Sequence, residues 1–164
     1  LEQLSADCRA AIDQEPGPAG REEVRKFIAK ACADDEFVAT HLGPDNMVAR
    51  QVIYEDDKHK FCILAHVYEG AKGSNPHDHG PSWAIYGQAV GVTTMTDWEK
   101  INEPSGDAPG QVKKIKDYDM TQGIAYLYNE GDLHSPSRTA TTRLIRVEGQ
   151  DLTGVKRDKY EAVV

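Results

Sequence analysis

The stretch 74-SNPHDHGPSWAIYGQAVG-91 carries two of the six histidines in this 164-residue chain. His77 and His79 lie one residue apart, and a Gly-Pro turn and a run of apolar and small residues follow them. Because side chains alternate along an extended strand, both histidines are expected to point to the same side. Two imidazoles that face one interior can bind one metal ion, with each nitrogen about 2.0–2.2 Å from it. The stretch therefore predicts two ligands of a metal site on a β-strand.

His134 is the best candidate for a third ligand. It lies in 129-NEGDLHSPS-137, after a Gly-Asp turn at the end of an apolar strand. The glycine lets the backbone turn sharply, which would aim the histidine toward the interior. His59 sits in a hairpin turn and His41 precedes a Gly-Pro break, so both are weaker candidates. The alternative is that no metal binds and that hydrogen bonds satisfy the histidines.

Outside these motifs the chain divides into a helical part and a strand-rich part. Residues 1–13 and 21–33 place apolar side chains at helical spacing, and a Gly-Pro break at 43–44 ends this part. Short strands separated by turn signals predict a sandwich or small barrel rather than βαβ units. We therefore expect a helical segment over 1–44 that packs on a β-barrel over 45–164, as one structural domain. The strands are expected at 47–55, 60–69, 82–98, 111–118, 123–130 and 141–149.

Composition and charge restrict the class of partner. The chain has 27 acidic against 19 basic residues, a formal net charge of −8, which argues against nucleic acid because phosphate binding needs clustered Lys and Arg. No apolar stretch approaches the roughly 20 residues that a membrane-spanning helix needs. The cysteines, Cys8, Cys32 and Cys62, are too widely spaced for a disulfide framework, so a reducing cytoplasm is expected. The expected partner is a small molecule, bound by a monomer or a homodimer.

The two histidine motifs together resemble the metal-binding motifs of the cupin superfamily. Cupins are mainly β proteins, double-stranded β-helix (jelly-roll) barrels in which the two motifs face each other. Here the motifs are 77-HDHGPSWAIYGQAVG-91 and 131-GDLHSPSR-138. The usual first motif has a glutamate ligand shortly after its second histidine, whereas this chain has Trp83-Ala84 there. The resemblance therefore implies a site of three histidines without a carboxylate.

A cupin site of three histidines is similar to that of cysteine dioxygenase and related thiol dioxygenases. The stretch 50-RQVIYEDDKHKFCILAHVYEGAKGSNPHDHG-80 looks like the bacterial thiol dioxygenase pattern, and the likeness covers about residues 45–150. In that register Arg50 matches the arginine that binds the substrate carboxylate, since a guanidinium can bind a carboxylate through two parallel bonds. A surface arginine on an edge strand is the alternative. The late strand departs from the family, with Arg146 and Glu148 where a histidine and a tyrosine are usual.

The resemblance implies Fe(II) as the metal and O2 and a small carboxylate-bearing thiol, such as cysteine or a mercapto acid, as substrates. Nickel, manganese or zinc are alternatives, because a histidine site follows metal availability as much as affinity. We predict Arg50, Trp83, Tyr86 and Arg146 as catalytic residues beside the three histidines. For the two aromatic residues, packing in the core is the alternative.

Two other classes of function stay open. A neutral three-histidine site would also suit cleavage of a diketone or aromatic ring by O2, or a metal-dependent lyase or isomerase. A lyase would turn over without oxygen, which separates it from a dioxygenase. The third class is a cupin that binds a small molecule without catalysis, and such a protein would bind its ligand unchanged after metal removal.

Overall fold

The computed structural model describes residues 1–163 of the chain, in which three helices precede ten strands. The helices are α1 (Glu2–Gln14), α2 (Pro18–Ala33) and α3 (Asp35–Leu42). The strands are β1 (Arg50–Glu55), β2 (Cys62–Tyr68), β3 (Lys72–Gly73), β4 (Ala84–Val90), β5 (Thr93–Asn102), β6 (Gly110–Met120), β7 (Ala125–Tyr128), β8 (Leu133–Arg138), β9 (Thr142–Glu148) and β10 (Tyr160–Ala162).

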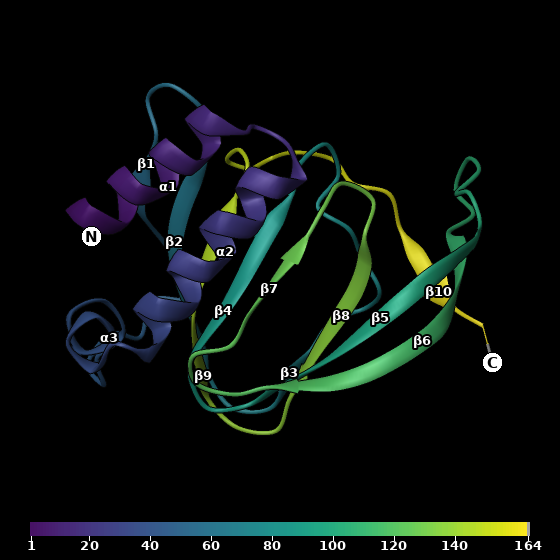
Figure 1. The fold of residues 1–164 in the computed structure, drawn as a ribbon. Helices are drawn as coiled ribbons and strands as arrows, with labels where there is room; N and C mark the ends of the chain where they lie inside the picture. Colours follow the sequence, from purple (N-terminus) through teal and green to yellow (C-terminus); the bar gives the residue numbers. More distant parts are fainter. Residues whose placement is uncertain (164) are drawn as a thin grey trace.

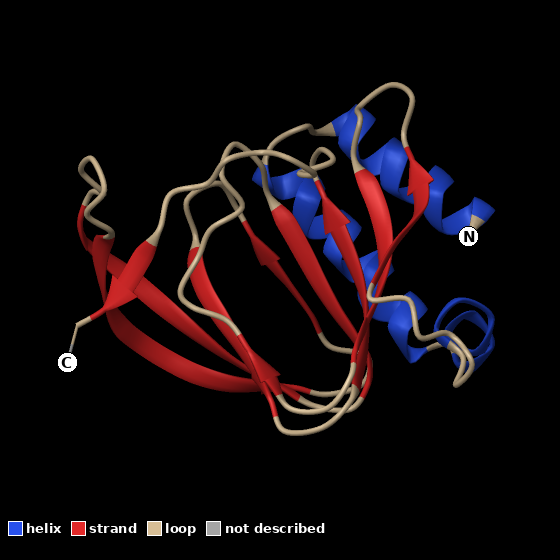
Figure 2. Ribbon diagram, turned by 180° about the vertical axis from the view of Figure 1, so that it is seen from behind, coloured by secondary structure: helices blue, strands red, loops and turns tan. Residues whose placement is uncertain are grey.

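In the described part of the chain the strands form two five-stranded sheets that face each other (Figures 1 and 2). One sheet has the order β1-β2-β9-β4-β7, and the other has the order β10-β6-β5-β8-β3. The chain passes between the sheets through the short turns β2–β3, β4–β5, β6–β7 and β8–β9, which gather at the lower end in Figure 1. This arrangement is the double-stranded β-helix that the sequence motifs imply, preceded by a helical segment.

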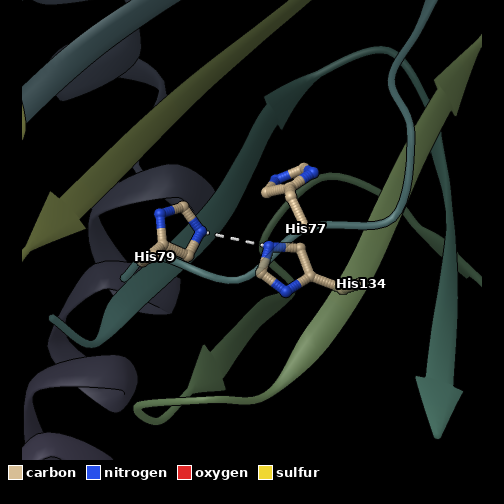
Figure 3. Close-up of side chains that lie close together, drawn as sticks. All are labelled: His77, His79 and His134. Atoms are coloured by element: carbon tan, nitrogen blue, oxygen red, sulfur yellow. Dashed lines mark hydrogen bonds between the residues drawn. The ribbon is translucent and has the colours of Figure 1, made fainter. Parts of the chain in front are cut away.

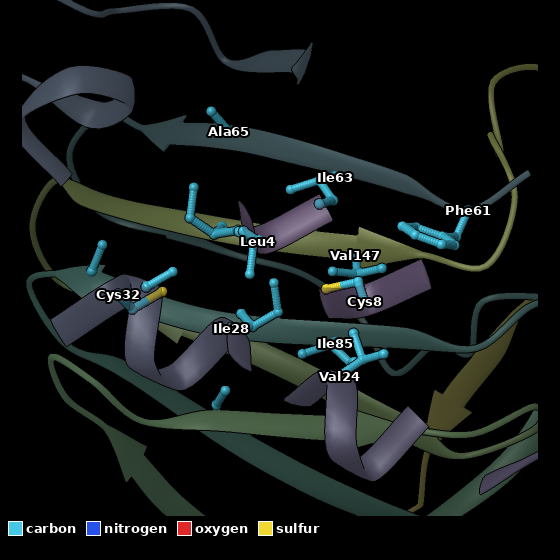
Figure 4. Packing of buried hydrophobic residues seen from close by; sticks show 14 of the residues in the cluster. Leu4, Cys8, Val24, Ile28, Cys32, Phe61, Ile63, Ala65, Ile85 and Val147 are labelled. Atoms are coloured by element: carbon cyan, nitrogen blue, oxygen red, sulfur yellow. The ribbon is translucent and has the colours of Figure 1, made fainter. Parts of the chain in front are cut away.

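Helices α1 and α2 cover the outer face of the first sheet (Figures 1 and 4). Leu4 and Cys8 recur at a spacing of four residues on α1, and Ile28 lies on the facing side of α2. They pack against outward side chains of the sheet, among them Ile63 and Val147, in one buried cluster. The barrel interior is therefore separated from the helices by a sheet with two buried faces, β2 and β4 being buried along almost their whole length.

The expected strand 82–98 is two strands in the structure. β4 ends at Val90 and β5 begins at Thr93, so the chain crosses from one sheet to the other within this segment. Gly91 has a φ of +78°, a backbone conformation that residues with a side chain rarely adopt. Strands β3, β8 and β10 escape prediction, and β8 does so because 133-LHSPSR-138 contains a proline and polar residues in place of an apolar run.

Candidate metal centre

The backbones of the two histidine motifs are joined directly. The amide of His77 donates to the carbonyl of His134 at 3.0 Å, and the amide of His134 donates back to the carbonyl of His77 at 2.9 Å. His134 lies on β8, as its second residue. His77 and His79 lie on an extended connection between β3 and β4, where one bridging residue pair replaces the expected strand. The antiparallel bridge places the two motifs against each other.

The three imidazoles converge on one point (Figure 3). The Nε2 atoms of His79 and His134 are 3.1 Å apart, and one nitrogen of each ring, His77 included, lies within 4.8 Å of the other two. Two nitrogens bound about 2.1 Å from one ion at a right angle would lie about 3.0 Å from each other. The observed separation therefore fits two ligands on one face of an octahedron, and the predicted three-histidine group is present.

Backbone carbonyls orient two of the rings. Nδ1 of His77 lies 2.8 Å from the carbonyl oxygen of Asn75, and Nδ1 of His134 lies 3.0 Å from that of Asp132. Because a carbonyl oxygen can only accept, each Nδ1 carries the proton and each Nε2 turns its lone pair toward the shared point. Within residues 1–163, Nδ1 of His79 is buried without a hydrogen-bond partner. Two of the three ligands are therefore held in the tautomer that can bind a metal through Nε2.

The imidazoles are held neutral. Burial disfavours the charged form and lowers the pKa of His77, and it lowers the pKa of His79 and His134 well below the usual range. Neighbouring histidines and the guanidinium of Arg146 add to this effect in His79 and His134. A neutral imidazole is the form that binds a metal ion, so the donor set fits a divalent cation without releasing protons first.

The hydroxyl of Tyr86 touches all three rings. Its oxygen lies 3.1 Å from Nε2 of His79, 3.3 Å from Nε2 of His134 and 3.5 Å from Nε2 of His77. The side chain is fully buried on β4, and burial raises the pKa of its hydroxyl. Tyr86, which the sequence predicts as a site residue, therefore presents a hydrogen-bond donor at the point where the imidazoles meet.

The ring of Tyr128 stacks on the ring of His134. The two rings stack with centroids 4.0 Å apart and an interplanar angle of 24°. The Tyr128 hydroxyl lies 2.6 Å from that of Tyr118, which donates to Asp97 at 2.7 Å. Since the Tyr118 proton goes to the carboxylate, Tyr128 donates to Tyr118, and this chain of bonds fixes the ring against which His134 rests.

No acidic side chain joins the three histidines within the described residues. The position where the usual first motif has a glutamate is occupied by Trp83 and Ala84. Ala84 faces the interior with Tyr86, whereas Trp83 belongs to the cluster between the sheet and the helices. The ligand set is therefore neutral, as the sequence indicates.

A cavity of about 190 Å³ lies beside the histidines. Positively charged side chains dominate its polar wall, and no acidic side chain lines it. Its lining consists of Tyr68, Lys72, Gly73, Ser74, His77, His79, Tyr86, Pro136, Arg138, Arg146 and Arg157.

Arg146, which the sequence predicts as a catalytic residue, lies at this cavity. Its guanidinium carbon is 4.4 Å from the ring centroid of Tyr86, and it donates to the hydroxyl of Tyr68 at 2.9 Å. A further nitrogen lies 3.4 Å from a carboxylate oxygen of Glu148. The positive charge of Arg146 is therefore partly balanced by the carboxylate of Glu148, which does not line the cavity.

Arg50 and Trp83 lie away from the histidines, contrary to their predicted place in the site. Arg50 binds the carboxylates of Glu148 at 3.2 Å and Asp151 at 3.1 Å, and it is absent from the cavity lining. Trp83 lies under the guanidinium of Arg21, 5.4 Å from its carbon, on the helix side of the sheet. Alternation explains Trp83, because it is an odd number of residues from the inward Tyr86.

Arg138 and Tyr68 also line the cavity, although neither is predicted from the sequence. The guanidinium of Arg138 lies over the ring of Tyr68 and donates from Nε to the hydroxyl of Thr93 at 3.2 Å. Its Nη2 is buried without a hydrogen-bond partner within residues 1–163. The available signal is alternation along β8, because Arg138 is four residues from His134 and shares its face.

No helix among the described residues is long and apolar enough to cross a membrane.

No protein-family model matches the sequence, and no curated protein matches it. Among solved structures, a cupin superfamily protein from Desulfitobacterium hafniense is similar over 65% of this chain and 81% of its own, with 10% identity and a TM-score of 0.45. A cupin-2 domain protein from Shewanella frigidimarina is similar over 72% of this chain and 95% of its own, with 12% identity and a TM-score of 0.46. KdgF from Halomonas is similar over 60% and 76%, with 11% identity and a TM-score of 0.44.

Proposed function

We propose that the protein is a metal-dependent dioxygenase that oxidises a small thiol bearing an acidic group. The observation that carries this proposal is the convergence of His77, His79 and His134 without a carboxylate ligand. Three ligands on one face of an octahedral ion leave three positions for substrate and O2. A neutral ligand set also leaves the charge of a divalent cation to be balanced by an anionic donor from the substrate, such as a thiolate.

Iron(II) bound by the three imidazoles would supply the activation of O2 and a positive charge for the thiolate sulfur. The overall reaction is R–SH + O2 giving R–SO2H, in which both oxygen atoms are transferred to sulfur. Sulfur loses four electrons and O2 gains them, so no external reductant is consumed. This balance suits a site that holds no second redox group among its described side chains.

The protein's own groups position the reactants. The hydroxyl of Tyr86 stands against all three Nε2 atoms and can donate a hydrogen bond to an oxygen or sulfur atom placed there. Met95 and Leu144 belong to the same buried cluster as Tyr86, so the ring that carries this hydroxyl is fixed by packing. The site therefore offers one preorganised polar hydrogen that can orient a bound reactant.

The acidic group of the substrate is assigned to the cationic wall of the cavity rather than to Arg50. Arg50 is matched by Glu148 and Asp151, whereas Arg138 lines the cavity and its buried Nη2 has no hydrogen-bond partner among the described residues. A guanidinium with free donors binds a carboxylate through charge-assisted bonds. The role that the family register gives to Arg50 is thus better supported for Arg138.

The test is metal analysis followed by O2 uptake with a panel of small thiols under iron-loaded conditions. We expect one iron per chain, uptake with a thiol acid, and a sulfinic acid product containing two oxygen atoms from labelled O2. Anaerobic turnover of any panel compound would instead favour a lyase or isomerase. Lack of oxygen uptake with the whole panel at full iron loading would contradict thiol oxidation.

A further inference from the structure

The cavity beside the histidines concentrates positive charge in an acidic protein. The chain has 27 acidic and 19 basic residues, yet four basic and no acidic side chains line this cavity. The four are Lys72, Arg138, Arg146 and Arg157. A local excess of positive charge in a protein whose net charge is negative is typical of a binding site for an anion.

Three of these four cations have no acidic partner. Arg146 lies 3.4 Å from Glu148, which also binds Arg50. Within residues 1–163, Lys72, Arg138 and Arg157 form no ion pair with an acidic side chain. The cavity therefore carries about three uncompensated positive charges before a metal adds its own.

Arg138 is the buried cation at the inner end of this cavity. The residue is 5% exposed, and its Nη2 has no hydrogen-bond partner among the described residues. A guanidinium keeps its proton at any physiological pH, so the charge is present in the barrel. A buried, unpaired charge is costly unless a ligand supplies the opposite charge and the missing hydrogen bonds. The site is therefore incomplete without an anion at Arg138.

Lys72 and Arg157 lie at the outer end of the cavity. Both are exposed, and they come from β3 and from the segment between β9 and β10. The ammonium of Lys72 is 5.5 Å from the ring centroid of Tyr68, the ring on which Arg138 also packs. Arg157 donates to the carbonyl of Asp78, next to both metal-binding histidines of the first motif, at 3.1 Å. One buried and two exposed cations thus flank the same space.

We propose that the ligand of this cavity is a small acid with two separate anionic groups, one bound by Arg138 and the other by Lys72 and Arg157. This inference rests on the proposed function, which locates the reaction at the three histidines, and it adds the number of anionic groups on the substrate. A thiol dicarboxylic acid is the simplest compound of this class, with its sulfur directed to the three histidines. A thiol with one carboxylate would leave two or more cations unmatched.

The decisive experiment is calorimetric binding to the full chain after metal removal, because it needs no turnover. Succinate is compared with butyrate, which has the same number of carbon atoms and one charge fewer, and with inorganic sulfate as a compact dianion. We expect succinate to bind at least about 10-fold more tightly than butyrate, with an affinity that falls as salt rises. Sulfate is expected to bind more weakly than succinate, because it cannot span two subsites.

Three variants locate the effect. Arg138→Met is expected to weaken succinate binding at least about 10-fold and to remove the preference over butyrate. Lys72→Gln is expected to weaken it about 3-fold, since an exposed charge is partly screened. Arg25→Gln, on α2 and outside the cavity lining, is the matched control and should leave binding unchanged. Because Lys72 is exposed, that variant still tests the inference if Arg138→Met does not fold.

Equal affinity for succinate and butyrate, or a preference for succinate that survives both cavity variants, would overturn the inference. Tighter binding of sulfate than of succinate would also overturn it, by pointing to one compact dianion in place of two groups. Oxygen uptake decides the proposed function separately. Uptake with a monocarboxylic thiol and none with a dicarboxylic thiol would retain the dioxygenase and reject this charge class.

Discussion

The guanidinium of Arg138 packs over the ring of Tyr68, with 4.0 Å between its carbon atom and the ring centroid. The two residues come from different sheets, since Tyr68 ends β2 and Arg138 ends β8. The hydroxyl of the same tyrosine accepts a hydrogen bond from Arg146. One aromatic side chain therefore positions two of the cations of the cavity, through its face and through its hydroxyl.

Substitution of Tyr68 should separate these two roles. Tyr68→Phe keeps the ring under Arg138 and removes the acceptor of Arg146, so anion binding should weaken only about 3-fold. Tyr68→Leu also removes the aromatic face, and binding should weaken about 10-fold or more because a desolvated cation–π contact contributes roughly 2 kcal/mol. Calorimetry with succinate measures both. Identical effects of the two substitutions would show that the ring face does not position Arg138.

Each metal ligand should be required for metal binding. Replacement of His77, His79 or His134 by Ala leaves two imidazoles, and we expect at least about a 100-fold loss of affinity for Fe(II) or Zn(II). Competition with a chelator and metal analysis of the purified variants measure this loss. His41→Gln on α3 is the matched control, because that histidine lies outside the barrel. Full metal loading in a single ligand variant would contradict the three-histidine centre.

Tyr86→Phe should preserve the metal and impair the reaction. The ring remains in the interior cluster under Arg146, while the hydroxyl that touches the three Nε2 atoms is lost. Loss of one preorganised hydrogen-bond donor lowers kcat by about 100-fold in comparable sites. Metal content and KM should change by less than about 3-fold, since neither depends on this donor. A large fall in metal content would assign the tyrosine to metal retention in place of catalysis.

The three-histidine group could be predicted from the sequence because it depends on short-range patterns. The spacing of His77 and His79 fixes their common side, and the Gly-Asp turn before His134 fixes how its strand enters the barrel. These relationships hold although the first motif lies on an extended connection and not on a strand. The convergence itself follows from one pair of backbone hydrogen bonds between the motifs.

The charged wall of the cavity could be predicted only in part. The direction of Arg50 is decided by the acids within its reach, and Asp151 is 101 residues away in the chain. Arg146 lies on a strand that the sequence predicts, and the structure places it at the cavity. Arg138 was not predicted as a cavity residue because Pro136 argues against a strand at 133–138. With β8 recognised as a strand, alternation from His134 places Arg138 on the inner face.

Asp56 should make the stability of the protein depend on pH below about 4. Its buried carboxylate accepts hydrogen bonds from the amide of His59 at 2.7 Å, the hydroxyl of Tyr54 at 2.7 Å and Nε of Arg9 at 2.6 Å. Burial opposes ionisation, but these bonds outweigh it and lower the pKa of Asp56 to about 2. The unfolded carboxyl titrates near 3.9, so the folded state binds this proton more weakly.

The resulting stabilisation is complete above about pH 4 and is lost as the pH falls through about 2. It amounts to roughly 2–3 kcal/mol, because one unit of pKa corresponds to about 1.4 kcal/mol. Asp56→Asn removes the titrating group, so its free energy of unfolding should be lower at pH 7 and should change less between pH 4 and 2. Urea unfolding at several pH values measures this difference. The same acid dependence in both proteins would exclude Asp56 as its source.

Gly87→Ala should destabilise the contact between the helices and the barrel without affecting the metal centre. A Cβ atom at this position would lie 2.6 Å from Cγ2 of Ile28 and 2.7 Å from Sγ of Cys32, both on α2. Overpacking of this kind costs about 1–3 kcal/mol. Metal affinity should be unchanged, because residue 87 faces the helices while Tyr86 faces the histidines.

A double-mutant cycle with Cys32→Ala makes this prediction specific. Removal of the buried Sγ alone should destabilise the fold by about 1 kcal/mol through lost packing, but it also clears one of the two close contacts of the new methyl group. The double variant should therefore lose less stability than the sum of the two single variants, by at least about 0.5 kcal/mol. Strict additivity in urea unfolding would mean that the cost at Gly87 arises from the backbone and not from the packing of α2 against β4.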